Sequence, residues 1–212
     1  MKTALITGGS GGIASGLDFS LSKMKYNVLK PSRAQLDVLD TLSMHSFFDL
    51  NEIDVLINNA GQIYTSPLVD SDTWLWENVV KVNLFGTYKM TREALRRNKQ
   101  TTIINISSMS AYQYFENFSA YASSKAGIVA MTKCLAAEGV KAYSICPGSV
   151  DTPFRKKLLR NVKESDMSKS HVNSKDMLLP SEIGDIVYDI LNNKYANGSS
   201  ILIRKNDIFE VR

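Results

Sequence analysis

The sequence predicts an α/β fold in which one doubly wound parallel sheet carries helices on both of its faces. Short apolar runs rich in β-branched residues recur along the chain and alternate with segments of helical pattern, an order typical of parallel sheets. The 212 residues, of which 44% are hydrophobic and 22% are charged, suffice for one domain with a substantial core. Because no Gly/Ser/Pro-rich linker divides the chain, we predict a single domain over residues 1–212.

About seven strands are predicted from the apolar runs. They cover Thr3–Thr7, Asn27–Lys30, Gln35–Val38, Asp54–Asn58, Thr102–Ile106, Val140–Cys146 and Ser200–Arg204. In a doubly wound sheet, strands counted along the chain take the order 3-2-1-4-5-6-7. Too few residues separate the second and third strands for a crossover helix, so we expect a short loop there and a trimmed sheet edge.

The segments between these strands are predicted to be helices. The main ones cover Gly12–Lys23, Thr41–Leu50, Ser71–Asn98, Ala120–Glu138 and Ser181–Asn192. Serine is a favoured N-cap, so we expect Ser71 and Ser181 to begin their helices, the second with Glu182 in its first turn.

Charge, histidines and cysteines narrow the classes of function. The net charge of +4, from 25 basic and 21 acidic residues, is too even to indicate a nucleic-acid partner. Cys134, Cys146, His45 and His171 lack the spacing of metal ligands, so no metal site is predicted. The first residues do not show the apolar region of a secretory leader, and no apolar run reaches membrane-spanning length. We therefore expect a cytoplasmic protein with reduced cysteines and no membrane partner.

Four glycines lie within five positions where the first strand runs into the first helix. They are Gly8, Gly9, Gly11 and Gly12. Glycines here let the backbone approach a phosphate closely and leave N–H groups free at the positive end of the helix. The stretch Gly9-x-Gly11-x-x-Ala14 satisfies the loose dinucleotide pattern in its required context of strand, turn and helix. This pattern favours a bound pyrophosphate over the alternative of a plain flexible turn.

Tyr121 and Lys125 lie four residues apart, and Tyr121 follows Ser108 by thirteen positions. An ordinary phenol has a pKa of about 10, but on a helix the Lys125 ammonium would lie one turn away and lower that pKa. A shift of about 3 units requires roughly 4 kcal/mol, which one close, partly desolvated cation can largely supply. Ser108 would then hold a substrate oxygen beside the phenol. A surface tyrosine and lysine on an amphipathic helix are the alternative.

Six motifs in their correct order resemble the short-chain dehydrogenase/reductase family, over the stretch from Thr3 to about Phe154. They are the glycine turn at Thr7, Gly8, Gly12 and Ile13, with Ala14 in place of the last glycine; Asn58-Asn59-Ala60-Gly61; Asn83; Ser108; Tyr121 with Lys125; and Pro147-Gly148 followed by Val150 and Thr152. The resemblance implies a Rossmann fold and hydride transfer between a nicotinamide coenzyme and a small carbonyl compound or secondary alcohol.

The resemblance also implies a role for each matching residue. The catalytic set is Asn83, Ser108, Tyr121 and Lys125, in which Asn83 completes a water-linked proton path towards Lys125. The coenzyme-binding set is Gly8, Ser10, Gly11, Gly12, Ile13, Ser32, Arg33, Asp37, Val38, Asn59, Ala60, Gly61, Tyr121, Lys125, Pro147, Gly148, Val150 and Thr152. Alternatives stay open for Asp37, as a surface turn carboxylate, and for Thr152, as an N-cap ahead of Pro153.

The end of the second strand predicts which coenzyme is preferred. An acidic residue there favours NAD, whereas arginine or serine accommodates the 2′-phosphate of NADP. The strand ends Lys30-Pro31-Ser32-Arg33, with no carboxylate before Asp37. We therefore predict a preference for NADP(H), with Arg33 and Ser32 at the phosphate, and leave NAD(H) open as a second coenzyme; a solvated Arg33 is the alternative.

The substrate and the assembly are less well determined by the sequence. The aromatic strip 112–118 should border the substrate pocket, and a short basic lid is expected near 151–178. Family assemblies pair the helices predicted at Ser71–Asn98 and Ala120–Glu138, which implies a homodimer or homotetramer. Residues Ser200–Arg212 lack the glycine-rich ending usual in the family. A non-catalytic NADP-binding regulator is the alternative function, and an epimerase would need a larger substrate domain.

Overall fold

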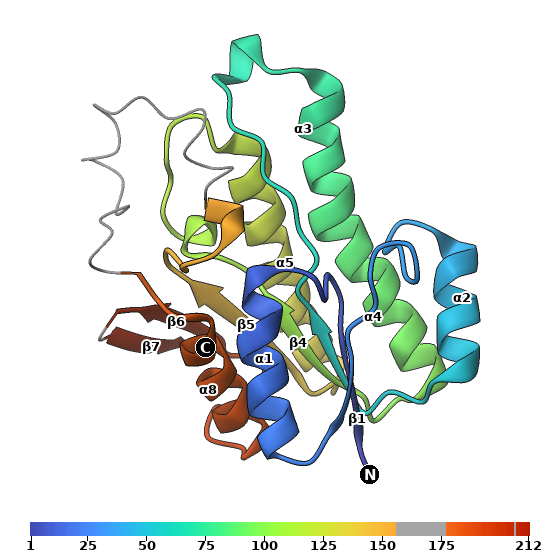
Figure 1. The fold of residues 1–212 in the computed structure, drawn as a ribbon. Helices are drawn as coiled ribbons and strands as arrows, with labels where there is room; N and C mark the ends of the chain where they lie inside the picture. Colours follow the sequence, from blue (N-terminus) through green and yellow to red (C-terminus); the bar gives the residue numbers. More distant parts are fainter. Residues whose placement is uncertain (156–176, 206) are drawn as a thin grey trace.

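A computed structural model gives the structure of residues 1–155, 177–205 and 207–212. Within these residues one sheet has seven strands in the order β2-β1-β3-β4-β5-β6-β7 (Figure 1). Neighbouring strands are parallel, except that β7 runs antiparallel to β6. The strands are β1 Thr3–Ile6, β2 Asn27–Leu29, β3 Val55–Asn58, β4 Thr102–Ile106, β5 Ala142–Pro147, β6 Ser200–Arg204 and β7 Asp207–Val211.

Helices cover both faces of the sheet (Figure 1). Helices α1 Gly12–Lys23 and α8 Pro180–Leu191 lie on one face, and their apolar side chains share a core cluster with β1, β3, β4, β5 and β6. The other face carries α2 Thr41–Leu50, α3 Thr73–Val80, α4 Gly86–Arg97 and α5 Ser119–Ala137. Strands β3 and β5 are buried along their whole length, as continuous apolar strands of a covered parallel sheet are. The predicted doubly wound α/β fold is confirmed.

Helices α1 and α8 cross with their backbones in contact. A Cβ added at Gly16 would lie 1.9 Å from the carbonyl oxygen of Pro180, and one at Gly184 would lie 2.4 Å from the carbonyl oxygen of Gly16. Only glycine fits at such a close approach. This contact holds the first turn of α1 in place relative to the carboxyl end of the sheet.

One predicted strand is absent, and one observed strand was not predicted. The strand predicted at Gln35–Val38 is a loop: Leu36 and Val38 bury their side chains, but this segment does not pair with β2. The backbone N–H of Asp37 donates to Ser43 Oγ (3.1 Å), and the Asp37 carboxylate accepts from the N–H of Leu39 (2.9 Å). These local bonds use groups that a ladder would need, so β2 is the edge strand. The seventh strand is instead β7, at the opposite edge.

The helix predicted over Ser71–Asn98 is three consecutive segments. Helix α3 leads into a π-helical turn, η2 Lys81–Phe85, and then into α4. The predicted N-caps are also wrong by one or two residues. Asp72, not Ser71, caps α3 by accepting from the N–H of Leu75 (2.8 Å), and at α8 the Glu182 carboxylate accepts from the N–H of Leu179 (2.6 Å). Ser71 instead ends the 3-10 turn η1 Leu68–Asp70.

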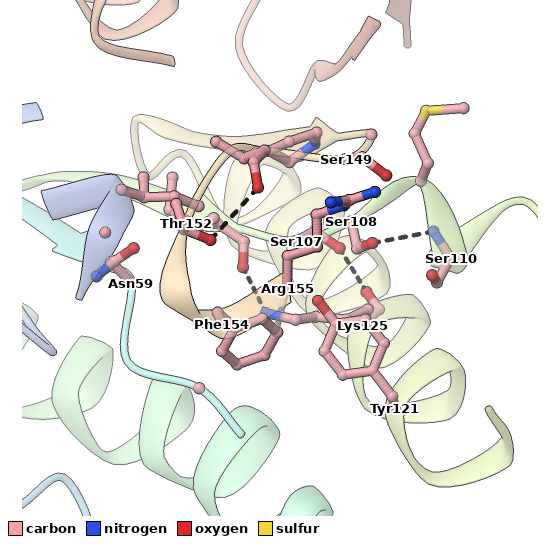
Figure 2. Close-up of a pocket in the computed structure, with 18 of the residues that line it drawn as sticks. Asn59, Ser107, Ser108, Ser110, Tyr121, Lys125, Ser149, Thr152, Phe154 and Arg155 are labelled. Atoms are coloured by element: carbon pink, nitrogen blue, oxygen red, sulfur yellow. Dashed lines mark hydrogen bonds between the residues drawn. The ribbon is translucent and has the colours of Figure 1, made fainter. Parts of the chain in front are cut away.

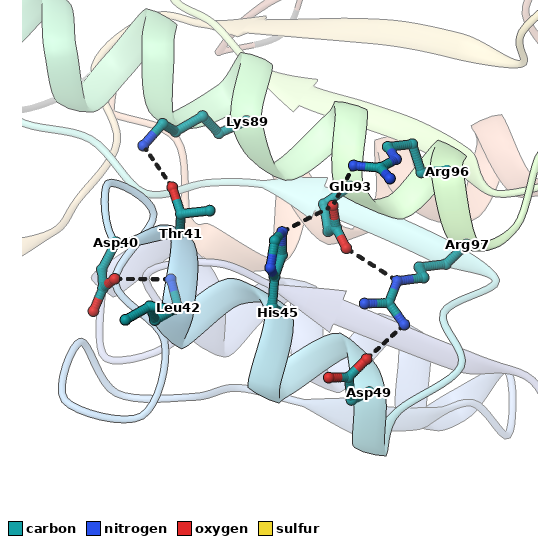
Figure 3. Close-up of polar contacts among 9 residues, drawn as sticks. All are labelled: Asp40, Thr41, Leu42, His45, Asp49, Lys89, Glu93, Arg96 and Arg97. Carbon is teal, nitrogen blue, oxygen red and sulfur yellow. Dashed lines mark hydrogen bonds and ion pairs between the residues drawn. The ribbon is translucent and has the colours of Figure 1, made fainter.

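A buried carboxylate joins α2 to α4 on the outer face of the sheet (Figure 3). Glu93 Oε1 accepts from Arg97 Nε at 3.0 Å, and Glu93 Oε2 lies 3.6 Å from His45 Nε2 and 4.0 Å from Arg96 Nη1. Arg97 also reaches Asp49 Oδ1 at 2.6 Å, and these two carboxylates raise the pKa of its guanidinium. We call these five residues the Glu93 cluster. It is part of the scaffold and lies away from the cavity described below.

Within the part of the chain that the structure describes, no helix is long and apolar enough to cross a bilayer. The same residues contain no group of three histidine, cysteine, aspartate or glutamate side chains placed to hold a metal ion. Cys134 and Cys146 are both free thiols, the first exposed and the second buried.

Candidate active site

A cavity of about 870 Å³ opens at the carboxyl end of the parallel strands. Open α/β sheets bind ligands in this position, where loops from neighbouring strands diverge. Five segments meet in the cavity wall: the glycine turn before α1, the turn after β3, the segment from β4 into α5, the turn after β5, and the end of β6 with the start of β7. Figure 2 shows side chains from several of them. Segments far apart in the sequence therefore converge on one site.

The glycine turn forms the wall at the start of α1. Gly8, Ser10, Gly11, Gly12 and Ile13 all line the cavity. Gly11 is the N-cap and makes no side-chain cap, so the first N–H groups of α1 are directed towards the cavity. These exposed donors at a positive helix end fit a pyrophosphate.

Close packing around the glycine turn explains why the turn needs glycines. Gly8 has a φ of +64°, and a Cβ there would lie 2.9 Å from the Cα of Ala60. A Cβ at Gly12 would lie 2.5 Å from the side chain of Thr152. The turn thus remains open to a ligand on one side while it contacts two neighbouring segments on the other. The residues present fit a dinucleotide.

The turn after β3 is held against β1 by side-chain hydrogen bonds. Thr7 Oγ1 accepts from the backbone N–H of Asn59 and of Ala60, both at 3.0 Å. Asn59 Nδ2 donates to the carbonyl oxygens of Thr7 (3.0 Å) and Gly8 (3.2 Å). Asn59, Ala60 and Gly61 are thereby fixed in the cavity wall. The Asn59 amide thus links the turn after β3 to the end of β1.

Ser108, Tyr121 and Lys125 line the same cavity (Figure 2). Tyr121 and Lys125 lie one turn apart on α5, as the spacing predicts, and both are buried, with 8% and 5% of their surface exposed. Lys125 Nζ lies 5.6 Å from the centre of the Tyr121 ring and donates to the carbonyl oxygen of Ile106 at 2.8 Å. Ser108 Oγ accepts from the N–H of Ser110 at 3.1 Å, and Ser108 acts to lower the pKa of Tyr121. The three groups therefore form one polar cluster inside an apolar wall.

The acid–base properties of this pair differ from the sequence expectation. Burial raises the pKa of Tyr121 to about 12, although the hydrogen bond from Ser108 acts in the opposite direction. Burial lowers the pKa of Lys125 to about 8. The expected lowering of the phenol pKa by Lys125 is not what this structure shows, because desolvation of the phenolate outweighs its stabilisation. At neutral pH the phenol is protonated, and so is most of Lys125.

Asn83 lies behind this cluster, within the π-helical turn η2. Its side chain is fully buried; Oδ1 accepts from the N–H of Gln62 (2.7 Å), and Nδ2 donates to the Gln62 carbonyl (3.0 Å) and to Ser124 Oγ (3.0 Å). Both Asn83 Oδ1 and Lys125 Nζ lie within 4 Å of a Cβ built on Gly61. Asn83 therefore approaches Lys125 across Gly61, although its amide bonds other groups. Single π-turns of this kind are common at functional sites.

The turn after β5 completes the wall opposite α5. Pro147, Gly148, Val150 and Thr152 line the cavity. The N–H of Gly148 donates to the carbonyl oxygen of Ile203 (2.8 Å), which extends the β5–β6 pairing into the turn. Thr152 Oγ1 donates to the carbonyl oxygen of Val150 at 3.4 Å.

Four residues of the predicted coenzyme set lie outside the cavity wall. Arg33 is exposed and its Nε donates to Asp37 Oδ2 at 2.9 Å, while Ser32 bonds Gln35 through both N and Oγ at 2.9 Å. Val38 is buried, and a Cβ built on Gly86 would lie 2.7 Å from it. Asp37 has the geometry of the alternative considered above, a carboxylate that stabilises its own turn.

Several wall residues were not identified from the sequence. Phe115 and Phe118 of the predicted aromatic strip do line the cavity, but Tyr114 is 85% exposed. The rings of Phe118 and Phe154 lie 6.4 and 6.3 Å from that of Tyr121. Arg155 belongs to the basic lid predicted near 151–178, and the unanticipated wall residues include Ser107, Met109, Ser110, Arg204, Lys205 and Asp207. The last three come from the end of β6 and the start of β7. These strands pair antiparallel, and the sequence analysis did not predict β7. The lid predicted near 151–178 lies outside the described residues over 156–176.

Comparisons with known proteins agree with this fold and site. The sequence profile of the short chain dehydrogenase family matches residues 34–163. The 3-oxoacyl-acyl-carrier-protein reductase FabG of Aquifex aeolicus is 29% identical over 198 residues, which cover 88% of this chain and 78% of that protein. A Streptomyces virginiae protein, described as a ketoacyl reductase of a monensin polyketide synthase, is 34% identical over 137 residues. This match covers 58% of this chain and 52% of the relative, so the chain spans about half the length of that protein.

A solved structure supports the same assignment. A small-chain dehydrogenase in complex with NADPH has a TM-score of 0.82 and 25% identity, with 96% of this chain and 97% of that chain covered. The family profile matches more than half of the sequence. The chain therefore belongs to the short chain dehydrogenase family and is an oxidoreductase of the class that acts on CH–OH or C=O groups.

Proposed function

We propose that this protein is an NADP(H)-dependent carbonyl reductase or dehydrogenase in which Tyr121 is the general acid and base. One observation carries the proposal: Ser108, Tyr121 and Lys125 line the same cavity as the open start of α1. A bound nicotinamide supplies the hydride that is exchanged with the substrate carbon. The protein supplies the position of the substrate and the proton.

Each polar side chain has a role that follows from its position. Ser108 Oγ, which lines the cavity together with Tyr121, orients the substrate oxygen towards the phenol. Lys125 places its ammonium between the Ile106 carbonyl and the Tyr121 ring, where it favours phenolate once the proton has left. Asn83 holds the Gln62 backbone beside Gly61 and completes the route by which Lys125 exchanges protons with solvent through water.

The protonation states favour the reductive direction at neutral pH. Burial raises the pKa of Tyr121 to about 12, so the phenol carries the proton that a reduced carbonyl oxygen needs. Tyr121 donates this proton to the substrate oxygen, and Lys125, with its pKa lowered to about 8, stabilises the phenolate that remains. The reverse reaction would need the phenolate, and we expect it to require higher pH.

The decisive experiment is Tyr121→Phe, which removes the hydroxyl and keeps the ring contacts with Phe118 and Phe154. Coenzyme oxidation at 340 nm is followed with a panel of ketones, aldehydes and acyl thioesters. We expect turnover to fall by at least about 10³-fold, with coenzyme affinity unchanged. Undiminished turnover would refute the role of Tyr121. Coenzyme binding by the unmodified protein without turnover of any substrate would favour the non-catalytic regulator instead.

We propose NADP(H) as the preferred coenzyme, with NAD(H) as the weaker one. The support is the exposed Arg33, which follows the end of β2; the backbone of Lys30, at that end, would lie 2.7 Å from a Cβ built on Gly9 of the glycine turn, and the Lys30 ammonium itself pairs with Asp18. Arg33 would leave Asp37 to form paired hydrogen bonds with a 2′-phosphate. The change Arg33→Glu should weaken NADPH binding about tenfold or more and leave NADH binding unchanged or improved. Equal loss for both coenzymes would contradict this assignment.

We also propose a homodimer formed through the α3–α4 and α5 faces, with a tetramer as the alternative. The support is the number of large apolar side chains that α3, η2 and α4 leave exposed: Trp74, Leu75, Phe85 and Tyr88. Exposed apolar patches of this kind mark protein interfaces. Sedimentation equilibrium of the protein and of Trp74→Ser tests the interface.

The free thiols of Cys134 and Cys146 support a cytoplasmic location.

A further inference from the structure

Two arginines of the cavity wall are used by neither the coenzyme site nor the proton chemistry. Arg155 follows the turn after β5, and Arg204 ends β6. Both are partly buried and both line the cavity that contains Ser108 and Tyr121. Figure 2 shows the Arg155 side chain pointing into this pocket, towards the side on which Ser108 and Ser149 lie.

The position of Arg204 follows from the alternation of side chains along β6. Ile201 and Ile203 belong to the core cluster shared with α1 and α8, so Arg204 faces the side of the sheet that α5 covers. The Cγ of Arg204 lies 3.8 Å from a Cβ built on Gly148. Both arginines therefore approach the segment Gly148–Ser149, on the side of the sheet where Tyr121 and Lys125 lie.

Among the wall residues that the structure describes, the charges at this end of the cavity do not cancel. Lys205 pairs with Glu182, its Nζ lying 3.0 Å from Oε2. Within the residues that the structure describes, Arg204 makes no ion pair, and Asp207 is the one acidic residue in the cavity wall. Basic groups therefore exceed acidic groups there. A partly desolvated guanidinium is most stable when it forms paired hydrogen bonds with an anion.

The opposite wall is aromatic. Phe115, Phe118 and Phe154 line it; the rings of Phe118 and Phe154 pack against the Tyr121 ring, and Phe115 packs against Phe118. A ligand of this cavity thus meets an apolar surface on one side of the reacting hydroxyl groups and guanidinium groups on the other. This arrangement distinguishes an anionic substrate from a neutral one.

We propose that Arg155 and Arg204 bind a carboxylate or phosphate group of the substrate, so that the enzyme selects anionic carbonyl compounds over neutral ones of the same shape. The inference rests on the proposed carbonyl chemistry and adds the substrate class to it. The pyrophosphate of the coenzyme has its own donors at the start of α1, so the coenzyme does not require these two arginines.

The test compares matched pairs of compounds that differ in charge. Acetoacetate is paired with methyl acetoacetate, and dihydroxyacetone phosphate with dihydroxyacetone; the two pairs distinguish carboxylate from phosphate. We measure kcat/KM with NADPH and, separately, the dissociation constant by calorimetry on the protein with NADP bound. The unmodified protein should favour the anionic member of at least one pair by about tenfold or more, in both measurements.

Variants identify the groups responsible. Arg155→Gln and Arg204→Gln should each reduce the preference for the anion, and together they should bring the paired compounds to within about twofold. Binding of the neutral compounds and of NADPH should not change. The control is Arg212→Gln, an exposed arginine at the end of β7. Thermal unfolding checks that each variant is folded.

Three outcomes would overturn the inference. The unmodified protein could show the same kcat/KM and the same dissociation constant for both members of each pair, or the preference for the anion could survive in the double variant. The variants could also lose as much affinity for NADPH as for the anionic compounds. The first needs no variant, so it stands even if a substitution prevents folding. Failure of the proposed function is a different result. In that case no compound is turned over, and the calorimetric preference for the anion still decides whether the two arginines form an anion site.

Discussion

Glu93 on α4 and Lys125 on α5 are both buried charged side chains, each with 5% of its surface exposed. Their surroundings are opposite. Glu93 is bonded by Arg97 and has His45 and Arg96 within 4.0 Å, so its charge is compensated (Figure 3). Lys125 donates to one carbonyl oxygen, and among the described residues no carboxylate forms an ion pair with it.

This difference separates a charge kept for stability from a charge kept for chemistry. A buried ion recovers its lost hydration only when well-placed partners surround it. Glu93 has such partners and joins α2 to α4. Lys125 has only a neutral acceptor, and burial lowers the pKa of its ammonium to about 8, which means that the fold is destabilised by holding the cation there. Such a group is expected at a functional site.

The largest effect is expected from Lys125→Met. Methionine fills a similar volume without the charge, so turnover should fall about 10²- to 10⁴-fold as the proton route is lost. The free energy of unfolding at pH 7 should not fall, because an uncompensated buried cation is removed. Steady-state kinetics and urea unfolding measure the two effects.

The matched control is Lys133→Met, on the same helix but exposed, which should leave both quantities unchanged. Lys125→Met could instead lower the free energy of unfolding and reduce turnover only as far as the smaller folded fraction accounts for. In that case Lys125 is structural and the contrast with Glu93 fails.

Burial also determines which parts of the fold can be predicted from the sequence. Alternating apolar runs give strands β4 and β6 and helices α1 and α2 to the residue, and strands β1, β3 and β5 to within two residues, because burial on both faces leaves a strong pattern. The errors lie at the two sheet edges. Residues 35–38 have the alternation of a strand, but local bonds of Asp37 turn the backbone away from β2. Strand β7 exposes both Ile208 and Phe209, so it lacks the alternation that would reveal it.

The candidate site follows a similar rule. Tyr121, Lys125 and the glycine turn are predictable, because their chemistry depends on spacing within one segment. Arg204 is not, because it reaches the cavity only through the pairing of β6 with β5. The pKa of Tyr121 is likewise set by the depth of burial, which the spacing from Lys125 does not reveal.

A smaller effect is expected in the pH dependence of stability. Lys125 has a folded-state pKa of about 8 against an ordinary value of 10.5, so between these pH values the unfolded state binds more protons and stability rises with pH. The rise amounts to about 3 kcal/mol. Tyr121 has the opposite sign: its pKa is raised from 10 to about 12, so its contribution is lost as pH rises through that range.

Urea unfolding of the unmodified protein and of Lys125→Met from pH 7 to pH 10 isolates the lysine contribution, because other groups cancel in the difference. The stability advantage of the methionine variant should shrink steadily above pH 8. A difference that stays constant over this range would mean that the buried ammonium is compensated after all, as Glu93 is.

The smallest effect is expected from substitution of Glu93, the compensated charge. Glu93→Ala should lower the free energy of unfolding by about 1–3 kcal/mol, because Arg97 and His45 lose their shared partner while remaining partly solvated. Kinetic constants should not change, since the Glu93 cluster is not part of the cavity wall. Glu77→Ala is the control: Glu77 forms an exposed pair with Lys81 at 2.8 Å, and its loss should cost less than about 0.5 kcal/mol. Equal effects of the two substitutions on the free energy of unfolding would show that burial does not strengthen the Glu93 cluster. Glu93 would then not be a charge kept for stability, and the contrast with Lys125 would fail.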